Sequence, residues 1–343
     1  MIILSGFLMV DISAVDLAAL PRPGELLYWR VSANPGGHPD NIALTLARLG
    51  HPGDDLAVVG AVGNDAFAEL IRRALSSFSV KALFQEVAGS TGKTVILKEK
   101  GKDRAFIADP GANSSLSLDF LAEAVKELSP SIFYLASGIL GEVDARLPEA
   151  YAAARKAGAI TFGDLVRPQG LGWDYVAPAF PFIDVFHVNA DEAAQITGFA
   201  EPAASASAIS RAGVKLALVS EERGVHASWD YGKKVVFQEG FKVNDVVDTT
   251  AAGDALVAGF IEKTSKGGLP STVEQIEDYL DFAQATAAVK CTGVSTSAVS
   301  ASAVNELLAQ RDTKKKSSKR RIRPPATQTK KGKERRRIRR PLD

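Results

Sequence analysis

The sequence predicts an α/β fold in which helices cover both faces of a mostly parallel central sheet. Short apolar runs with the length of buried strands alternate with stretches whose apolar residues recur at helical spacing. Apolar strands separated by helices are typical of three-layer α/β/α proteins. The predicted strands lie at 56–60, 132–135, 159–162, 185–188 and 216–219, and the predicted helices at 41–49, 65–75, 148–157 and 202–212.

Local signals support these elements in chain order. Residues 1–10 are apolar but lack the basic start and cleavage site of a signal peptide, so we predict a buried first strand. Asp65 is expected to cap the N-terminus of the 65–75 helix. Pro148 and Pro202 each open a predicted helix, a position that suits proline because the first turn needs no N–H donor.

Two regions interrupt the alternation of strands and helices. The segment 12–34 holds prolines and short apolar runs, and 91–108 has the pattern of a hairpin with its turn at 100–102. We expect them to form a small β-sheet lid over the functional site. The alternative is an edge extension of the main sheet.

Composition bounds the class of protein. The chain has 343 residues, 46% of them hydrophobic and 24% charged, which is typical of a globular enzyme with one large domain or two smaller ones. The single cysteine, Cys291, excludes an internal disulfide framework and a multi-cysteine zinc site. It indicates a reducing compartment, so we expect a cytoplasmic protein. No apolar run approaches the length of a membrane helix.

A net charge of +1 conceals two oppositely charged parts. Residues 311–343 hold 16 Lys/Arg and 3 Asp/Glu, a net charge of +13, and the remainder therefore carries −12. We divide the chain into a domain over 1–310 and a basic, disordered tail over 311–343. Contact with nucleic acid or another polyanion is one expectation for the tail, although it lacks aromatic residues for stacking on bases.

The most informative segment is 248–254, which reads Asp-Thr-Thr-Ala-Ala-Gly-Asp and runs into a helical pattern. Small residues before a helix let several backbone N–H groups converge on one anion, helped by the helix dipole. An aspartate there would oppose a bound phosphate, but it suits a base that deprotonates an attacking hydroxyl. The segment indicates phosphoryl transfer to an alcohol.

Several motifs in order give the chain a resemblance to the ribokinase-like sugar and nucleoside kinases, the phosphofructokinase-B type, over about residues 1–300. The segment 36–43, Gly-Gly-His-Pro-Asp-Asn-Ile-Ala, is similar to the N-terminal signature of that family. The resemblance implies that Gly36, Gly37 and Asn41 bind the sugar. Paired glycines admit the backbone to a hydroxyl, and Asn41 offers a donor and an acceptor. The alternative is a tight turn with a helix cap.

Three further residues are implied to face the acceptor. Asp11 follows the predicted first strand, where the family places an aspartate that binds substrate hydroxyls; a solvated loop residue is the alternative. Residues 111–113, Gly-Ala-Asn, resemble a family motif near the substrate, which implies a role for Asn113. Asp109 is expected to face the same pocket.

The 248–254 segment also matches a motif of that family, except that Ala251 stands where the family has a glycine. It implies that Asp254 is the catalytic base and that the amides of Ala251, Ala252 and Gly253 form the anion hole. Asp248 and the carbonyl of Thr250 match positions that hold a monovalent cation such as K⁺ in many relatives.

ATP and Mg²⁺ are the implied cofactors. Asn189 and Glu192 match an Asn-x-x-Glu motif that organises Mg²⁺ through water beside the nucleotide phosphates, although the same pattern also caps helices. Ser220 and Gly224 match a nucleotide-lining motif. Arg167, in a shortened Asp-x-Asn-x-Arg pattern, is expected to reach a phosphate or an acidic substrate.

One departure in the nucleotide motif is Glu221-Glu222, which adds negative charge where phosphates are expected. The hypothesis is ATP-dependent phosphorylation of a sugar hydroxymethyl group. The alternatives are a nucleoside kinase of the same fold, or a catalytically weak sugar sensor whose tail binds a polyanion. Dimerisation through the lids is a further implication of the resemblance.

Overall fold

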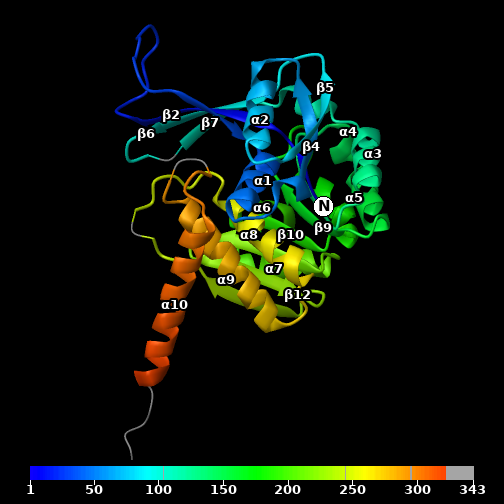
Figure 1. Cartoon of the computed structure of the whole chain (residues 1–343), viewed down its shortest axis with the longest axis vertical. Coiled ribbons are helices and arrows are strands. Elements are labelled where there is room, and N and C mark those ends of the chain that lie inside the picture. Colours follow the sequence, from blue (N-terminus) through cyan, green and yellow to red (C-terminus); the bar gives the residue numbers. More distant parts are fainter. Residues whose placement is uncertain (103, 244, 294–295, 322–343) are drawn as a thin grey trace, which may run out of the picture.

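A computed structural model describes residues 1–102, 104–243, 245–293 and 296–321, with the main chain alone described for 312–321. It forms a large layered body from which a smaller sheet projects (Figure 1). The predicted three-layer α/β/α architecture with a separate small sheet is confirmed. No helix in the described part of the chain is long and apolar enough to span a bilayer.

The main sheet has nine strands in the order β13-β12-β11-β10-β9-β8-β1-β4-β5. Neighbours from β11 through β5 are parallel, and β12 and β13 add an antiparallel edge that the sequence analysis did not predict. The strands are β1 Ile2–Gly6, β4 Leu56–Gly63, β5 Lys81–Val87, β8 Ile132–Ser137, β9 Ile160–Leu165, β10 Val185–Asn189, β11 Leu216–Glu221, β12 Gly224–Trp229 and β13 Lys234–Glu239.

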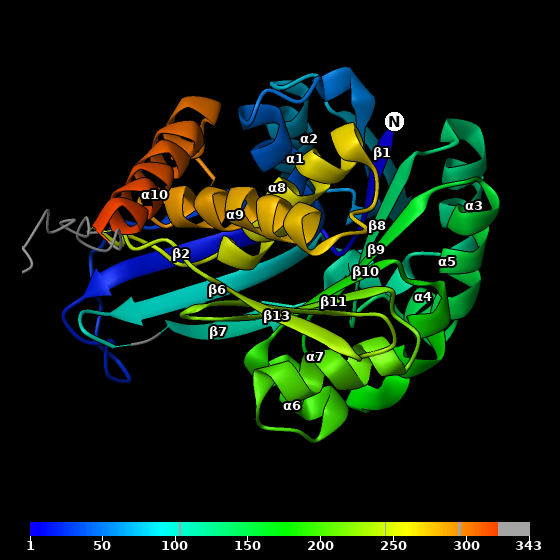
Figure 2. The same cartoon turned by 90° about the horizontal axis from the view of Figure 1, so that it is seen from below.

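Helices cover both faces of this sheet, as Figure 2 shows. α1, α2, α8 and α9 lie on one face, and α3, α5, α6 and α7 lie on the other. The α-helices are α1 His38–Arg48, α2 Ala66–Ser76, α3 Leu118–Leu128, α4 Glu142–Ala145, α5 Leu147–Lys156, α6 Ala190–Thr197, α7 Pro202–Arg211, α8 Ala252–Gly267, α9 Val273–Lys290 and α10 Ala301–Arg321. Short 3₁₀ helices are η1 Gly53–Asp55, η2 Gly111–Ser115 and η3 Trp173–Phe182.

Burial explains why the central strands were readable from the sequence. Every residue of β4 and β8 is buried, because helices cover the sheet on both sides and leave no polar face. The predicted cap at Asp65 is confirmed: its carboxylate accepts hydrogen bonds from the backbone N–H groups of Phe67 and Ala68. The same carboxylate accepts the Thr91 N–H at 2.8 Å and so fixes the start of the small sheet.

The small sheet contains β2 Met9–Leu17, β3 Ser32–Gly36, β6 Gly92–Glu99 and β7 Arg104–Asp109, in the order β3-β2-β6-β7. Because these strands pair only with one another in the described residues, the alternative of an edge extension is wrong. The apolar N-terminal run is also not one strand. Phe7 and Leu8 separate β1 from β2, so Asp11 lies within the small sheet rather than after the first strand.

The C-terminal region differs from its prediction. α10 continues to Arg321, beyond residue 311, where the sequence analysis starts the disordered tail. Arg311 packs on the body: its guanidinium lies 3.4 Å from the ring centre of Phe241 and pairs with Asp281 at 2.6 Å. The remaining predicted tail, 322–343, lies outside the described residues.

Candidate active site

The 248–254 segment forms a tight turn that leads into α8. The Asp248 carboxylate accepts hydrogen bonds from the N–H (2.9 Å) and hydroxyl (2.7 Å) of Thr250. Ala251 adopts a left-handed conformation with φ 60°, which is uncommon for a residue with a side chain. The Ala252 N–H donates to the Thr249 carbonyl at 3.2 Å, whereas Gly253 lies in the first helical turn, where N–H groups have no helical acceptor.

Two large cavities meet at this turn. One, the hairpin cavity of about 1070 Å³, is bounded by the β11–β12 hairpin. The other, the lid cavity of about 940 Å³, lies beneath the small sheet. The hairpin cavity touches Thr249, Ala252 and Gly253, and the lid cavity touches Asp248, Thr250 and Ala251. The turn therefore separates two compartments, each large enough for a small-molecule reactant.

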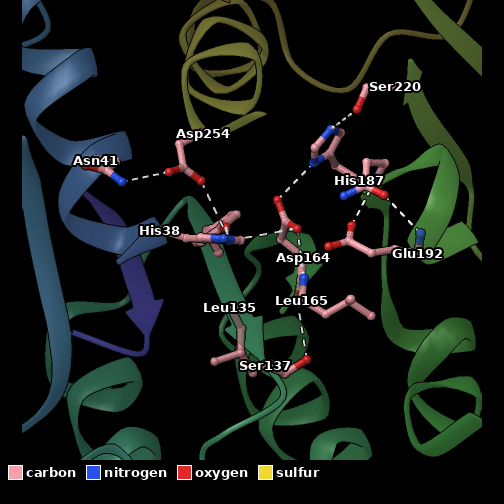
Figure 3. Close-up of polar contacts among 12 residues, drawn as sticks. His38, Asn41, Leu135, Ser137, Asp164, Leu165, His187, Glu192, Ser220 and Asp254 are labelled. Carbon is pink, nitrogen blue, oxygen red and sulfur yellow. Dashed lines mark hydrogen bonds and ion pairs between the residues drawn. The ribbon is translucent and has the colours of Figure 1, made fainter. Parts of the chain in front are cut away.

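Asp254 lies behind the turn and is 5% exposed. The Asn41 side-chain amide donates to its Oδ2 at 2.8 Å, and His38 Nδ1 lies 3.6 Å from its Oδ1 (Figure 3). Burial raises the pKa of Asp254, and Asp164 adds to the rise, whereas His38 and Asn41 oppose it. The result is a carboxyl group whose pKa lies above its ordinary value.

The start of α1 brings His38 and Asn41 to this carboxylate. Gly37 precedes the helix with φ 88°, and a Cβ there would approach the Phe7 carbonyl oxygen to 2.3 Å. Only glycine therefore fits this corner. Because His38 and Asn41 are three positions apart on a helix, they project from the same face.

A chain of polar groups continues from His38 along the ends of three strands. Asp164 Oδ1 lies 3.9 Å from His38 Nδ1, and its Oδ2 lies 3.0 Å from His187 Nδ1 (Figure 3). His187 Nε2 in turn lies 3.1 Å from the Ser220 hydroxyl. Burial by itself would lower the pKa of both histidines, but the surrounding carboxylates outweigh it and raise the pKa of each.

Asn189 and Glu192 form a capping box at the start of α6. Asn189 Oδ1 accepts the Glu192 N–H, and Glu192 Oε2 accepts the Asn189 N–H, both at 2.9 Å. The capping alternative is thus confirmed, but it engages only one Glu192 oxygen. Burial, and then Asp164, raise the pKa of Glu192. The described residues contain no cluster of three or more His, Cys, Asp or Glu that would enclose a metal. The pair fits Mg²⁺ held through water.

The other predicted nucleotide residues divide into two groups. Ser220 and Gly224 line the hairpin cavity together with Asn189. Arg167 is exposed after β9 and lines neither of the two cavities. Glu221 and Glu222 also line the hairpin cavity; the Glu221 carboxylate lies 3.2 Å from His226 Nε2 and 3.4 Å from Arg223, whose charge offsets its own.

The residues predicted to bind the acceptor fall into two groups, those at the lid cavity and those outside it. Asp11 lines the lid cavity with Asn41; burial and the charge of Asp254 raise the pKa of Asp11 to about 6. Gly36 faces this carboxylate so closely that a Cβ would come within 2.4 Å of Asp11 Oδ2. Asp109 is exposed and paired with Lys93, and the buried Asn113 amide bridges both backbone groups of Leu8. The last two lie outside the lid cavity lining.

Sequence reasoning missed several charged residues at the turn. His38 and Asp164 belong to motifs in which roles were assigned only to neighbouring residues. The helical spacing of His38 and Asn41 would have indicated that both side chains face the same group. His187, Arg104 and Lys290 carry no local signal of their own. Arg104 of β7 donates to the hydroxyls of Thr249 and Thr250, and so links the small sheet to the turn.

Helices on both faces of a mostly parallel sheet, together with a separate small sheet, give the chain the ribokinase-like fold, and the 248–254 turn lies between two of its cavities. The chain belongs to the pfkB family of carbohydrate kinases, which matches residues 5–303. It is accordingly an ATP-dependent sugar kinase.

Individual relatives agree with this family. The chain is 29% identical to fructokinase-2 of Oryza sativa subsp. japonica over 279 residues, which cover 75% of this chain and 79% of that protein. It is 25% identical to the adenosine kinase of Dictyostelium discoideum over 274 residues, covering 72% and 78%. The structure of Arabidopsis thaliana ribokinase complexed with ribose and ATP superposes with a TM-score of 0.72 at 24% identity, covering 90% and 98%.

Proposed function

We propose that the protein transfers the γ-phosphoryl group of ATP to a hydroxymethyl group of a sugar, with Asp254 as the base. The observation that carries this proposal is the position of the 248–254 turn between two cavities, with a buried carboxylate behind it. ATP enters the hairpin cavity and the acceptor enters the lid cavity. The reacting groups then meet at the first turn of α8.

In the proposed reaction the acceptor hydroxyl gives its proton to Asp254 as its oxygen attacks the γ-phosphorus. A new oxygen–phosphorus bond forms, the bond from the γ-phosphorus to the bridging oxygen breaks, and ADP leaves. Asp11 and Asn41 orient the acceptor. The N–H of Gly253 in the first turn of α8, together with the positive end of that helix, stabilises charge on the transferring group.

One of the three amides expected to form the anion hole, that of Ala252, is already hydrogen-bonded within the turn. The Ala252 N–H donates to the Thr249 carbonyl, so it joins the anion hole only if this 3.2 Å bond opens. Mg²⁺, held through water by Asn189 and Glu192, neutralises phosphate charge when bound. The small sheet covers the acceptor and excludes water that would otherwise hydrolyse ATP.

A nucleoside is the second candidate acceptor. Tyr28 and Trp29 line the lid cavity, and aromatic side chains offer a stacking surface for a base. The similarity to an adenosine kinase favours the same alternative. A sugar alone would need only the polar groups that line that cavity.

The decisive test is release of ADP from Mg-ATP against a panel of sugars and nucleosides, for the wild type and Asp254→Asn. We expect turnover with one acceptor class and a loss of about a thousandfold in the variant, with ATP affinity retained. Asp119→Asn is the matched control, because it removes an exposed aspartate from the first turn of another helix, α3.

Retention of more than about a tenth of wild-type turnover by Asp254→Asn would reject Asp254 as the base. A well-folded wild type that binds ATP but turns over none of the acceptors would favour the sugar-sensor alternative. The identity of the productive acceptor decides between sugar and nucleoside.

A further inference from the structure

Lys290, the last residue of α9, has a side chain that is 0% exposed. Lysine is almost never fully buried unless its charge is paired. Here the ammonium group donates to the main-chain carbonyl of Asp248 at 2.9 Å and lies 3.4 Å from Asp248 Oδ2. Both acceptors belong to the residue that begins the anion-binding turn.

The same turn is approached by a second cation from its other side. Arg104 Nη1 lies 3.6 Å from Asp248 Oδ1, and Arg104 Nη2 donates to the Thr249 hydroxyl at 3.0 Å. The Asp248 carboxylate therefore stands between a lysine of the body and an arginine of the small sheet. Both cations lie within 4 Å of this carboxylate and offset its negative charge.

These contacts bear directly on the monovalent cation that the resemblance implies at Asp248 and Thr250. The residues present do not fit such an ion, because the Lys290 ammonium already takes the carbonyl and one carboxylate oxygen of Asp248. A metal ion bound to the same oxygens would lie beside this buried ammonium, and like charges repel strongly where water is excluded.

We propose that the Lys290 ammonium is a built-in substitute for a monovalent cation, which holds the 248–253 turn in its anion-binding form and makes the enzyme independent of K⁺. An ammonium group carries the same unit charge as K⁺, and here it binds the carbonyl and one carboxylate oxygen of Asp248, oxygen types that K⁺ also binds. Because it is tethered to α9, its occupancy does not depend on the salt in solution. The inference rests on the proposed phosphoryl transfer at this turn.

The first test compares activity at constant ionic strength in KCl and in tetramethylammonium chloride, whose cation is much larger than K⁺ and has no N–H donor. We expect wild-type rates that agree within about twofold. Lys290→Met keeps the apolar stem but removes the charge. Its turnover should fall at least about thirtyfold in tetramethylammonium chloride and recover about tenfold when KCl or NH₄Cl is supplied.

The second test measures thermal unfolding of the same proteins and needs no acceptor. We expect the wild-type Tm to be the same in both salts, whereas K⁺ or NH₄⁺ should raise the Tm of Lys290→Met by binding the vacated position. Lys266→Met is the matched control: this lysine lies on α8 and is 71% exposed, so neither readout should change.

Three results would overturn the inference: a wild type that loses most of its activity without K⁺, a Lys290→Met variant as active as the wild type in tetramethylammonium chloride, or a folded variant whose Tm and rate ignore K⁺ and NH₄⁺. If no acceptor supports turnover, the proposed function fails but the Tm comparison still decides the role of Lys290. If Lys290→Met does not fold, the wild-type salt comparison decides it.

Discussion

The pH dependence of activity is predicted to change when His38 loses its charge. His38→Asn retains a polar group at the Nδ1 position but cannot carry the positive charge that faces Asp254 and Asp164. Without this charge, ionisation of Asp254 becomes less favourable and its pKa rises. Because the base must be ionised, activity is lost as the pH falls through that pKa, and the acidic limb should move to higher pH.

The geometry sets the size of this shift. At the 3.6 Å that separates His38 Nδ1 from Asp254 Oδ1, two unit charges interact by about 1 kcal/mol in water and by about 5 kcal/mol at an effective dielectric near 20. One pKa unit corresponds to about 1.4 kcal/mol. The His38 side chain is 23% exposed and shares its charge with Asp164, which reduces the effect. We therefore expect a shift of about 1–2 pH units.

The assay measures kcat/KM for the productive acceptor over a pH range of about 5 to 9. His51→Gln is the control, because it removes another histidine that pairs with a carboxylate, Glu262, outside both cavities. It should leave the acidic limb in place. An acidic limb that stays fixed in His38→Asn, with rates lowered equally at every pH, would refute the electrostatic reasoning.

The histidine contributes to stability with the opposite pH dependence. The folded-state pKa of His38 is raised above its ordinary value, although burial alone would lower it, because Asp254, Asp164 and Glu192 favour its charged form. This stabilisation is fully present below the unfolded-state pKa of histidine and is lost as the pH rises through the folded-state pKa. The same titration therefore couples folding to the state of the active site.

Two other predictions concern magnesium and assembly. Glu192→Gln should raise the Mg²⁺ concentration that gives the half-maximal rate about tenfold. Glu201→Gln, which changes a glutamate in another helix cap, should leave this concentration unchanged. Equal Mg²⁺ dependence of the two variants would contradict the assignment of Glu192 to the metal. The edge strand β7 exposes Phe106 and Ile107, 55% and 65% accessible, which favours dimerisation through the lid. Light scattering should give a dimer for the wild type and a monomer for Ile107→Glu. A monomeric wild type would exclude dimerisation through the lid.

The fold was predictable where local pattern and tertiary environment agree. β4 and β8 are buried along their whole length, so their sequences read as continuous apolar runs. The edge strand β13 was missed because none of its residues is buried, and β12 was missed because glycine, histidine and serine interrupt its apolar pattern. The lid start was misplaced for a related reason: an apolar run of residues 1–10 has no signal that its two halves enter different sheets.

The sequence by itself indicated the alternation of central strands and helices, the small-residue turn at 248–254 before a helix, and the family, because each depends on residues that are close together along the chain. Only the tertiary structure decided which charges surround that turn. Asn41 and Asp254 are 213 positions apart, and Arg104 reaches Thr250 across 146. Lys290 meets Asp248 because α9 ends beneath the turn. Electrostatic contacts depend on distance in space, which a chain fixes only once it has folded.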